Sequence, residues 1–277
     1  MERIKVKVGN ICIEIRTEVA SIKKRIKEHY KDFLSQDSAD LLIDVQYGNF
    51  LKPKFKKVLF KTRAWELGKK NDFFSIYFFH PKNPSWAKFN AELNHIRFFT
   101  KDPSGQLLLY LFPEILFSLI SLRYQTLMLH ACGILNNKKG HLFVAQAKGG
   151  KSTLAKLALK RKLTVLNDDR IVVTKKREVF KIYGTPWHGD VENTSNKYLD
   201  TERILFLKKA NFNKIQLMDK KEALIELLQN NFCLTIDSDI IKRRFNFCLD
   251  LVEKLKCYRL YFKADESIWE FLDGYFK

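Results

Sequence analysis

Residues 141–170 constrain the fold of this 277-residue chain more than any other stretch. The segment HLFVAQAKGGKSTLAKLALKRKLTVLNDDR begins with an apolar run, residues 142–145, which predicts a strand. Two adjacent glycines follow, and leucine and alanine at helical spacing then predict a helix over 152–161. A second predicted strand, 163–166, ends in Asn167, Asp168 and Asp169. This order is typical of a strand–loop–helix unit whose loop binds phosphate, with paired carboxylates at the tip of a neighbouring strand.

The residue types of this loop suit phosphate chemistry. Gly149 and Gly150 would let backbone N–H groups approach phosphate oxygens, and the start of the helix adds partial positive charge. Lys151 would lie against the outer phosphates, and the hydroxyl of Ser152 would bind Mg²⁺. A carboxylate facing the loop would hold the metal or accept the proton of an attacking hydroxyl. We predict a nucleotide site formed by Gln146, Ala147, Lys148, Gly149, Gly150, Lys151, Ser152 and Thr153.

One position departs from the full phosphate-loop pattern, G-x-x-x-x-G-K-[ST]. Ala145 stands where the first glycine of that pattern belongs. A lysine-rich loop that caps an ordinary strand–helix–strand unit is therefore the alternative interpretation. The helical setting and the aspartate pair favour the phosphate site.

The net charge of +19 is spread along the whole chain and is mostly lysine. It fits either a solvated basic surface or an acidic partner, namely a nucleotide, an acidic peptide or nucleic acid. Nucleic acid is the least favoured of these, because the sequence contains no recognisable nucleic-acid module.

Membrane and oxidising environments are not indicated. The most apolar run, 107–122, contains Pro113 and Glu114 and predicts a buried helix, not a membrane span. The five cysteines are scattered without a C-x-x-C pair, which fits a reducing cytoplasm better than a disulfide or zinc framework. The first residues lack the apolar core of a signal peptide.

The domain prediction is a small α+β domain over 1–104 and a second domain over 105–277. In the first, alternating apolar residues over 3–16 predict two strands joined at Gly9-Asn10, and apolar spacing predicts a helix over 19–34. The second domain is predicted to begin with a helix over 105–124.

Two further features are open on residue patterns alone. His130 lies in an apolar run, 127–135, that predicts a strand beside the loop, where it could be a half-buried structural histidine or a catalytic one. The segment 184–190, GTPWHGD, could be an ordered loop near a ligand or a plain turn with Trp187 packed on the core.

Three segments together resemble the kinase domain of the HPr kinase/phosphorylase superfamily, in its divergent HPr-kinase-like branch: LHACGIL, FVAQAKGGKSTLAKLALKRKLTVLNDDRIVV and VFKIYGTPWHG. The resemblance is dense over 126–190 and looser up to residue 275. It implies an α+β or α/β fold similar to phosphoenolpyruvate carboxykinase, with a mixed, largely antiparallel sheet and helices packed on it. It also implies Mg²⁺-dependent transfer of the γ-phosphoryl group of ATP to a serine hydroxyl.

The resemblance implies roles for individual residues. Asp168 corresponds to the proton acceptor, Asp169 helps to place the metal or substrate together with Ser152, and His130 lies near the reacting phosphoryl group. The acceptor would be a serine-containing peptide or protein, and the lysine excess suits an acidic one. A homo-oligomer is compatible with the resemblance.

A second function stays open. Ala145, and the lack of a convincing copy of the family's downstream glutamate–arginine motif, are compatible with a nucleotide-binding regulatory protein without phosphotransfer activity. The phosphorylase activity of the bifunctional enzyme is not implied.

Overall fold

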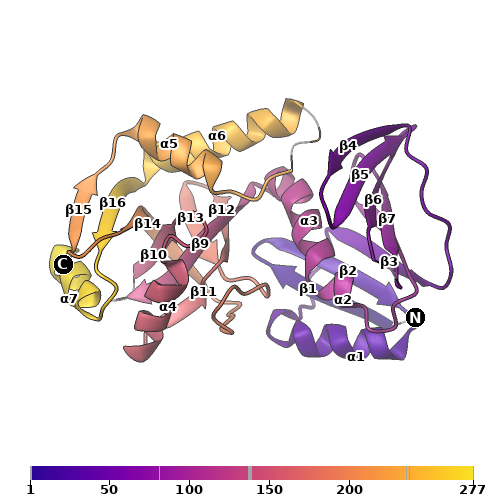
Figure 1. Ribbon diagram of the computed structural model, residues 1–277, viewed down its shortest axis with the longest axis horizontal. Coiled ribbons are helices and arrows are strands. Elements are labelled where there is room, and N and C mark those ends of the chain that lie inside the picture. Colours follow the sequence, from indigo (N-terminus) through magenta and orange to yellow (C-terminus); the bar gives the residue numbers. More distant parts are fainter. Residues whose placement is uncertain (1, 81, 137–138, 235, 237, 277) are drawn as a thin grey trace. The chain divides into compact units, whose positions relative to one another are not determined.

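The computed structural model describes residues 2–80, 82–136, 139–234, 236 and 238–276, and their contacts divide the chain into two units (Figure 1). The first unit comprises Met1–Lys7 and Ile11–Leu116, and the second comprises Val8–Asn10 and Phe117–Lys277. This division assigns residues 105–116 to the first unit, whereas the sequence analysis placed them in the second domain. The fold within the described residues is mixed α+β, as predicted.

An eight-stranded mixed sheet forms most of the first unit. Its strands are β1 (Glu2–Val8), β2 (Ile11–Thr17), β3 (Leu41–Tyr47), β4 (Lys57–Lys61), β5 (Trp65–Lys70), β6 (Phe73–Phe78), β7 (Ser85–Asn90) and β8 (His95–Thr100). They lie in the order β1-β2-β3-β8-β7-β6-β5-β4, with β2, β3 and β8 parallel and β4 to β8 antiparallel. The two strands predicted on either side of Gly9-Asn10 are confirmed as β1 and β2.

Both helices predicted around the first unit are broken. The helix predicted over 19–34 is shorter in the structure, where α1 (Ala20–His29) is followed by a short 3₁₀ turn, Lys31–Phe33. The helix predicted over 105–124 divides at Tyr110 into α2 (Gln106–Leu109) and α3 (Leu111–Ile120), before a 3₁₀ turn over Ser121–Tyr124. Pro113 explains this second break, because it has no N–H to donate to the carbonyl of Leu109 and its ring would clash with that carbonyl.

The second unit is built on strands that are mostly antiparallel, as the resemblance implied. They are β9 (Thr126–Asn136), β10 (Lys139–Val144), β11 (Thr164–Asn167), β12 (Arg170–Lys176), β13 (Val179–Tyr183), β14 (Tyr198–Lys209), β15 (Lys214–Leu217) and β16 (Lys256–Phe262). Six of the described strand pairs are antiparallel, and only β10–β14 and β14–β16 are parallel.

Two long strands change partners along their length. Residues 126–130 of β9 pair with β12, and residues 131–136 pair with β10. Strand β14 pairs first with β13 over 198–200, then with β10 from residue 201 and with β16 from residue 203. Residues 133–135 of β9 also pair with β11, on the edge opposite β10, so β10, β11 and β12 all end beside the middle of β9, near His130 and Ala131.

Helices cover both faces of this sheet system (Figure 1). The helices α4 (Lys151–Lys160) and α7 (Ser267–Tyr275) share one apolar core with β10, β11 and β16. The helices α5 (Lys220–Gln229) and α6 (Ser238–Lys254) share a second core with β9, β12 and β13. Within the described residues no helix has both the length and the apolar character to cross a membrane.

Candidate functional site

The predicted strand–loop–helix unit is confirmed as β10, the loop 145–150 and α4. The loop turns tightly, because Gly149 N–H donates to the carbonyl of Gln146 at 3.0 Å. A side chain at Gly149 would place its Cβ 2.6 Å from the Cβ of Ala145. The alanine at the unusual first position of the loop therefore packs directly against Gly149.

Gly150 has a backbone φ of +105° and gives α4 an uncapped start. A Cβ added there would lie 2.5 Å from the ring of Phe262 and 3.3 Å from Cε of Lys209. The loop geometry thus requires glycine for both conformation and space.

We expect Gly150→Ala to lower the stability of the fold and to weaken its response to nucleotide. The positive φ and the contact with Phe262 would force the first amides of α4 to move, at a strain of roughly 1–3 kcal/mol. The change in melting temperature on adding ATP and Mg²⁺ measures this effect, and Gly274→Ala is the matched control, since no atom lies within 4 Å of its added Cβ. An unchanged nucleotide response in Gly150→Ala would contradict this account of the loop.

Lys151 is buried at the first turn of α4, with 5% of its surface exposed. Its Nζ donates to the carbonyls of Ala145 at 2.9 Å and Gln146 at 3.1 Å. Burial lowers the pKa of this amine, against the opposing influence of nearby acidic groups, chiefly Asp169. The Lys151 side chain therefore folds back onto the carbonyls of its own loop. Asp168 and Asp169 are close enough to raise its pKa, against the effect of burial.

The strand registers bring His130 to the same place. Ala131 pairs with Val144 at the end of β10, so the loop begins beside His130. His130 in turn pairs with Arg170 at the start of β12, and its Nε2 lies 2.8 Å from Oδ1 of Asp169. The loop after β10, His130 of β9 and the start of β12 thus lie side by side, although they are far apart in the sequence.

Asp169 is held on two sides, by His130 and by the guanidinium of Arg170. Burial would raise the pKa of its carboxyl, but His130, Arg170 and Lys151 outweigh this and lower it below its usual value. Asp169 is therefore a carboxylate at neutral pH, facing the loop lysine.

Asp168 lies deeper than Asp169 and is fully buried. Its Oδ1 accepts a hydrogen bond from Gly189 N–H at 2.9 Å. Its Oδ2 has no hydrogen-bond partner among the described residues. An unsatisfied buried carboxylate oxygen costs free energy, and such a group commonly marks a site where a proton, a metal or a substrate binds.

The side chain of Asn167 stabilises the turn that carries Asp168 and Asp169 through hydrogen bonds. Its Oδ1 accepts from the N–H groups of Asp169 at 2.8 Å and Arg170 at 2.9 Å. Its Nδ2 donates to the carbonyls of Thr185 at 3.0 Å and Trp187 at 3.1 Å. One buried side chain therefore ties the aspartate pair to the 184–190 segment.

The 184–190 segment packs on the core through Trp187, and its end lies beside Asp168 and Asp169. Trp187 is buried and packs edge-on against Phe117, with ring centroids 5.7 Å apart. The end of the segment reaches the site instead, because Gly189 covers Asp168, and a Cβ there would lie 3.0 Å from both of its carboxylate oxygens. The segment is thus both a core anchor and a wall of the site.

An open cavity of about 510 Å³ lies in front of the loop. Its walls include His130, Ala147, Lys148, Gly150, Lys151, Ser152, Thr153, Asp169, Gly189, Asp190 and Lys209. Of the predicted residues, Gln146 and Gly149 shape the loop, and Asp168 lies behind the wall. The remaining predicted site residues all line this one cavity.

Three lining residues, Gly189, Asp190 and Lys209, were not among the predicted site residues. Asp190 ends a segment that already suggested a ligand loop, so its glycines and tryptophan were a usable signal. Lys209 is the last residue of β14 and follows Lys151 by 58 positions. Its neighbours in the sequence do not distinguish it from the other lysines of the chain. Only the parallel pairing of β14 with β10 brings it over Gly150.

The oxygen donors at the cavity are compatible with Mg²⁺. The described residues contain no cluster of three or more His, Cys, Asp or Glu side chains able to hold a metal ion. Mg²⁺ needs fewer protein ligands, because it usually keeps waters and binds one or two carboxylates plus substrate phosphates. Ser152 and Asp169 line the cavity, and the unsatisfied Oδ2 of Asp168 lies behind it.

Thiol chemistry does not fit the site. Burial raises the pKa of the Cys132 thiol, on β9, well above its usual value, and partial burial raises the pKa of Cys233, which does not line the cavity, to about 11. We expect iodoacetamide at pH 8 to label both thiols far more slowly than free cysteine, since only the thiolate reacts. Peptide mass spectrometry against pH tests this, and rapid labelling of Cys233 at pH 8 would contradict the inferred burial.

Comparisons with known proteins add little to this geometry. No protein-family model and no curated protein sequence match the chain. A solved structure of the HPr(Ser) kinase/phosphatase from Coxiella burnetii aligns with 53% of this chain and 95% of that chain, at 11% sequence identity and a TM-score of 0.32. A likeness at this level carries no functional argument, so function has to be inferred from the site itself.

Proposed function

We propose that the chain is an ATP- and Mg²⁺-dependent kinase that transfers a phosphoryl group to a serine hydroxyl of a peptide or protein. The second unit would then be a kinase domain similar in fold to phosphoenolpyruvate carboxykinase. The observation that carries the proposal is one cavity that gathers a glycine loop at a helix N-terminus, a buried lysine and an ionised carboxylate, with a second, unsatisfied carboxylate behind its wall.

The proposed nucleotide site is the loop and the first turn of α4. Backbone N–H groups and the helix N-terminus favour phosphate oxygens. Lys151 would exchange its two carbonyl partners for phosphate oxygens, and Lys209 adds a second cation over Gly150. Ser152 and Asp169 would hold Mg²⁺, which neutralises charge on the transferring phosphoryl group.

Asp168 is the proposed proton acceptor. Its Oδ2 has no partner to give up, so accepting the serine proton breaks no existing hydrogen bond. Gly189 covers the carboxylate, so a serine hydroxyl reaches it only if the 188–190 segment moves aside. His130 would orient Asp169 through the 2.8 Å contact beside the reacting group.

A nucleotide-binding regulatory protein is the second candidate. Two observations favour it: Asp168 is buried away from solvent, and Lys151 Nζ already donates to two loop carbonyls. This protein would bind nucleotide and pass no phosphoryl group on.

The test combines binding with transfer. The chain is incubated with Mg²⁺, γ-labelled ATP and an array of serine peptides, half of them flanked by acidic residues. The proposal predicts label on serine that disappears when that serine is replaced by alanine. A rise in melting temperature with ATP and Mg²⁺ but no labelled peptide would favour the regulator, and neither response would overturn both functions.

A further inference from the structure

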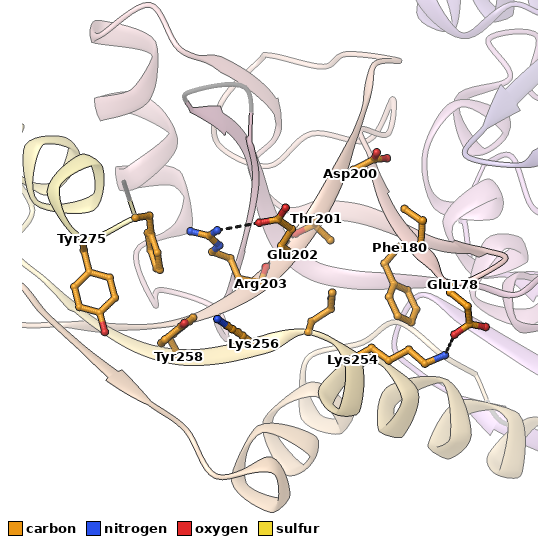
Figure 2. A pocket seen from close by; sticks show the side chains of 13 residues that line it. Glu178, Phe180, Asp200, Thr201, Glu202, Arg203, Lys254, Lys256, Tyr258 and Tyr275 are labelled. Atoms are coloured by element: carbon orange, nitrogen blue, oxygen red, sulfur yellow. Dashed lines mark hydrogen bonds and ion pairs between the residues drawn. The ribbon is translucent and has the colours of Figure 1, made fainter.

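A second cavity lies in the second unit, at the opposite end of β14 from the loop 145–150 (Figure 2). Its volume is about 730 Å³, within the range of small-molecule sites. Residues of β13, β14, β16, α6 and α7 form its walls, and none of them lines the cavity in front of the loop. The phosphotransfer site therefore makes no use of it.

The acidic side chains of this cavity already have cationic partners. Glu178 pairs with Lys254, and Asp200 lies 3.4 Å from Lys181. Glu202 accepts from Nη2 of Arg203 at 3.1 Å. The carboxylates therefore leave little unbalanced negative charge.

Two cationic side chains of the cavity, Arg203 and Lys256, have fewer acidic or hydrogen-bonding partners than the carboxylates. Arg203 is 9% exposed, and its Nη1 is buried with no hydrogen-bond partner among the described residues. Its guanidinium otherwise lies over the ring of Phe276, 4.1 Å from the centroid. Lys256 is exposed on the same wall and forms no ion pair with the described part of the chain. A buried guanidinium N–H without an acceptor is costly, so an incoming oxygen would gain a charge-assisted hydrogen bond.

Aromatic rings complete this end of the cavity. Tyr258 and Tyr275 each meet Phe276 edge-on, with centroids 5.5 Å and 5.0 Å away. Figure 2 shows Arg203, Lys256 and the two tyrosines grouped together, while Glu178 and Lys254 lie at the far end. Cations beside an aromatic wall suit a ligand that has an anionic group on an apolar body.

We propose that this cavity binds a small organic oxyanion, a carboxylate or phosphate on an apolar body, through Arg203 and Lys256. The anion accepts hydrogen bonds from the two cations, and the apolar body packs on Tyr258 and Tyr275. The inference is independent of phosphotransfer, because it uses no residue of the loop site.

Calorimetric titration with three probes tests the proposal: phenyl phosphate, benzoate and the neutral benzyl alcohol. We expect at least one anion to bind saturably and the alcohol to bind at least about tenfold more weakly, as expected for loss of a charge-assisted contact. Binding of phenyl phosphate without binding of benzoate would identify a phosphate site. Binding of benzoate would identify a carboxylate site. Equal affinity for the alcohol, or no saturable binding of either anion, would overturn the proposal.

Three variants locate the site. Lys256→Glu should weaken the bound anion about tenfold or more, because it reverses a charge on the wall without touching the core. Lys214→Glu is the matched control, an equal charge reversal at an exposed lysine of β15 outside the cavity. Lys151→Ala removes the loop lysine. Loss of binding in Lys151→Ala with none in Lys256→Glu would place the anion at the loop and contradict the proposal.

Discussion

Asp168→Asn is expected to lower the rate of phosphoryl transfer by roughly a hundredfold to ten-thousandfold, the usual contribution of a general base. The amide oxygen can still accept the hydrogen bond from Gly189 N–H, so the fold should be retained. The amide nitrogen would stand where the unsatisfied Oδ2 stands now, and it cannot accept a proton. Steady-state transfer of labelled phosphate to a serine peptide measures the effect.

The control for Asp168→Asn is the same chemical change far from the site. Asp32→Asn alters an exposed carboxylate of the first unit and should leave the rate unchanged. Nucleotide binding by Asp168→Asn, followed as a shift in melting temperature, should also persist, because the proposal assigns phosphate binding to the loop and not to this carboxylate. Equal transfer rates in wild type and Asp168→Asn would remove Asp168 from the mechanism.

Asn167→Ala is expected to lower the free energy of unfolding by about 3 kcal/mol, among the larger effects of a single substitution. The change leaves two partly buried N–H donors and two buried carbonyls without this partner. The aspartate pair and the 184–190 segment then lose their common support, so transfer should fall as well. Urea unfolding followed by fluorescence measures the stability.

Asn193→Ala is the matched control for Asn167→Ala. Asn193 Nδ2 makes one hydrogen bond, to the carbonyl of Val165 at 2.7 Å. Its loss should cost only about 1 kcal/mol. Similar losses in the two variants would show that Asn167 does not stabilise the turn that carries Asp168 and Asp169.

The local part of the site could be predicted from the sequence. An apolar run, two glycines, Lys151 and a helical repeat are all within twenty residues, so spacing alone indicated β10, the loop and α4. The aspartate pair after β11 was also visible. Pro113, by contrast, was noted only as an argument against a membrane span, although its missing N–H also breaks the predicted helix.

The rest of the site depends on pairing between distant strands. The contact between His130 and Asp169 follows from the register of β9 and β12, which no single-strand pattern specifies. Lys209 and the hydrogen bonds of Asn167 depend on elements that meet only after folding. The burial of Asp168 under Gly189 likewise could not be inferred, because it depends on how the 184–190 segment returns over the strand.

The central claim is that the amides around residues 146–152 form the phosphate site in front of Asp168 and Asp169. A crystal structure of the chain with Mg²⁺ and a non-hydrolysable ATP analogue tests it most directly. The account predicts the β- and γ-phosphates on the loop amides, with Lys151 Nζ moved from the carbonyls of Ala145 and Gln146 to phosphate oxygens. Nucleotide bound elsewhere, with Lys151 still closed onto its own loop, would contradict it.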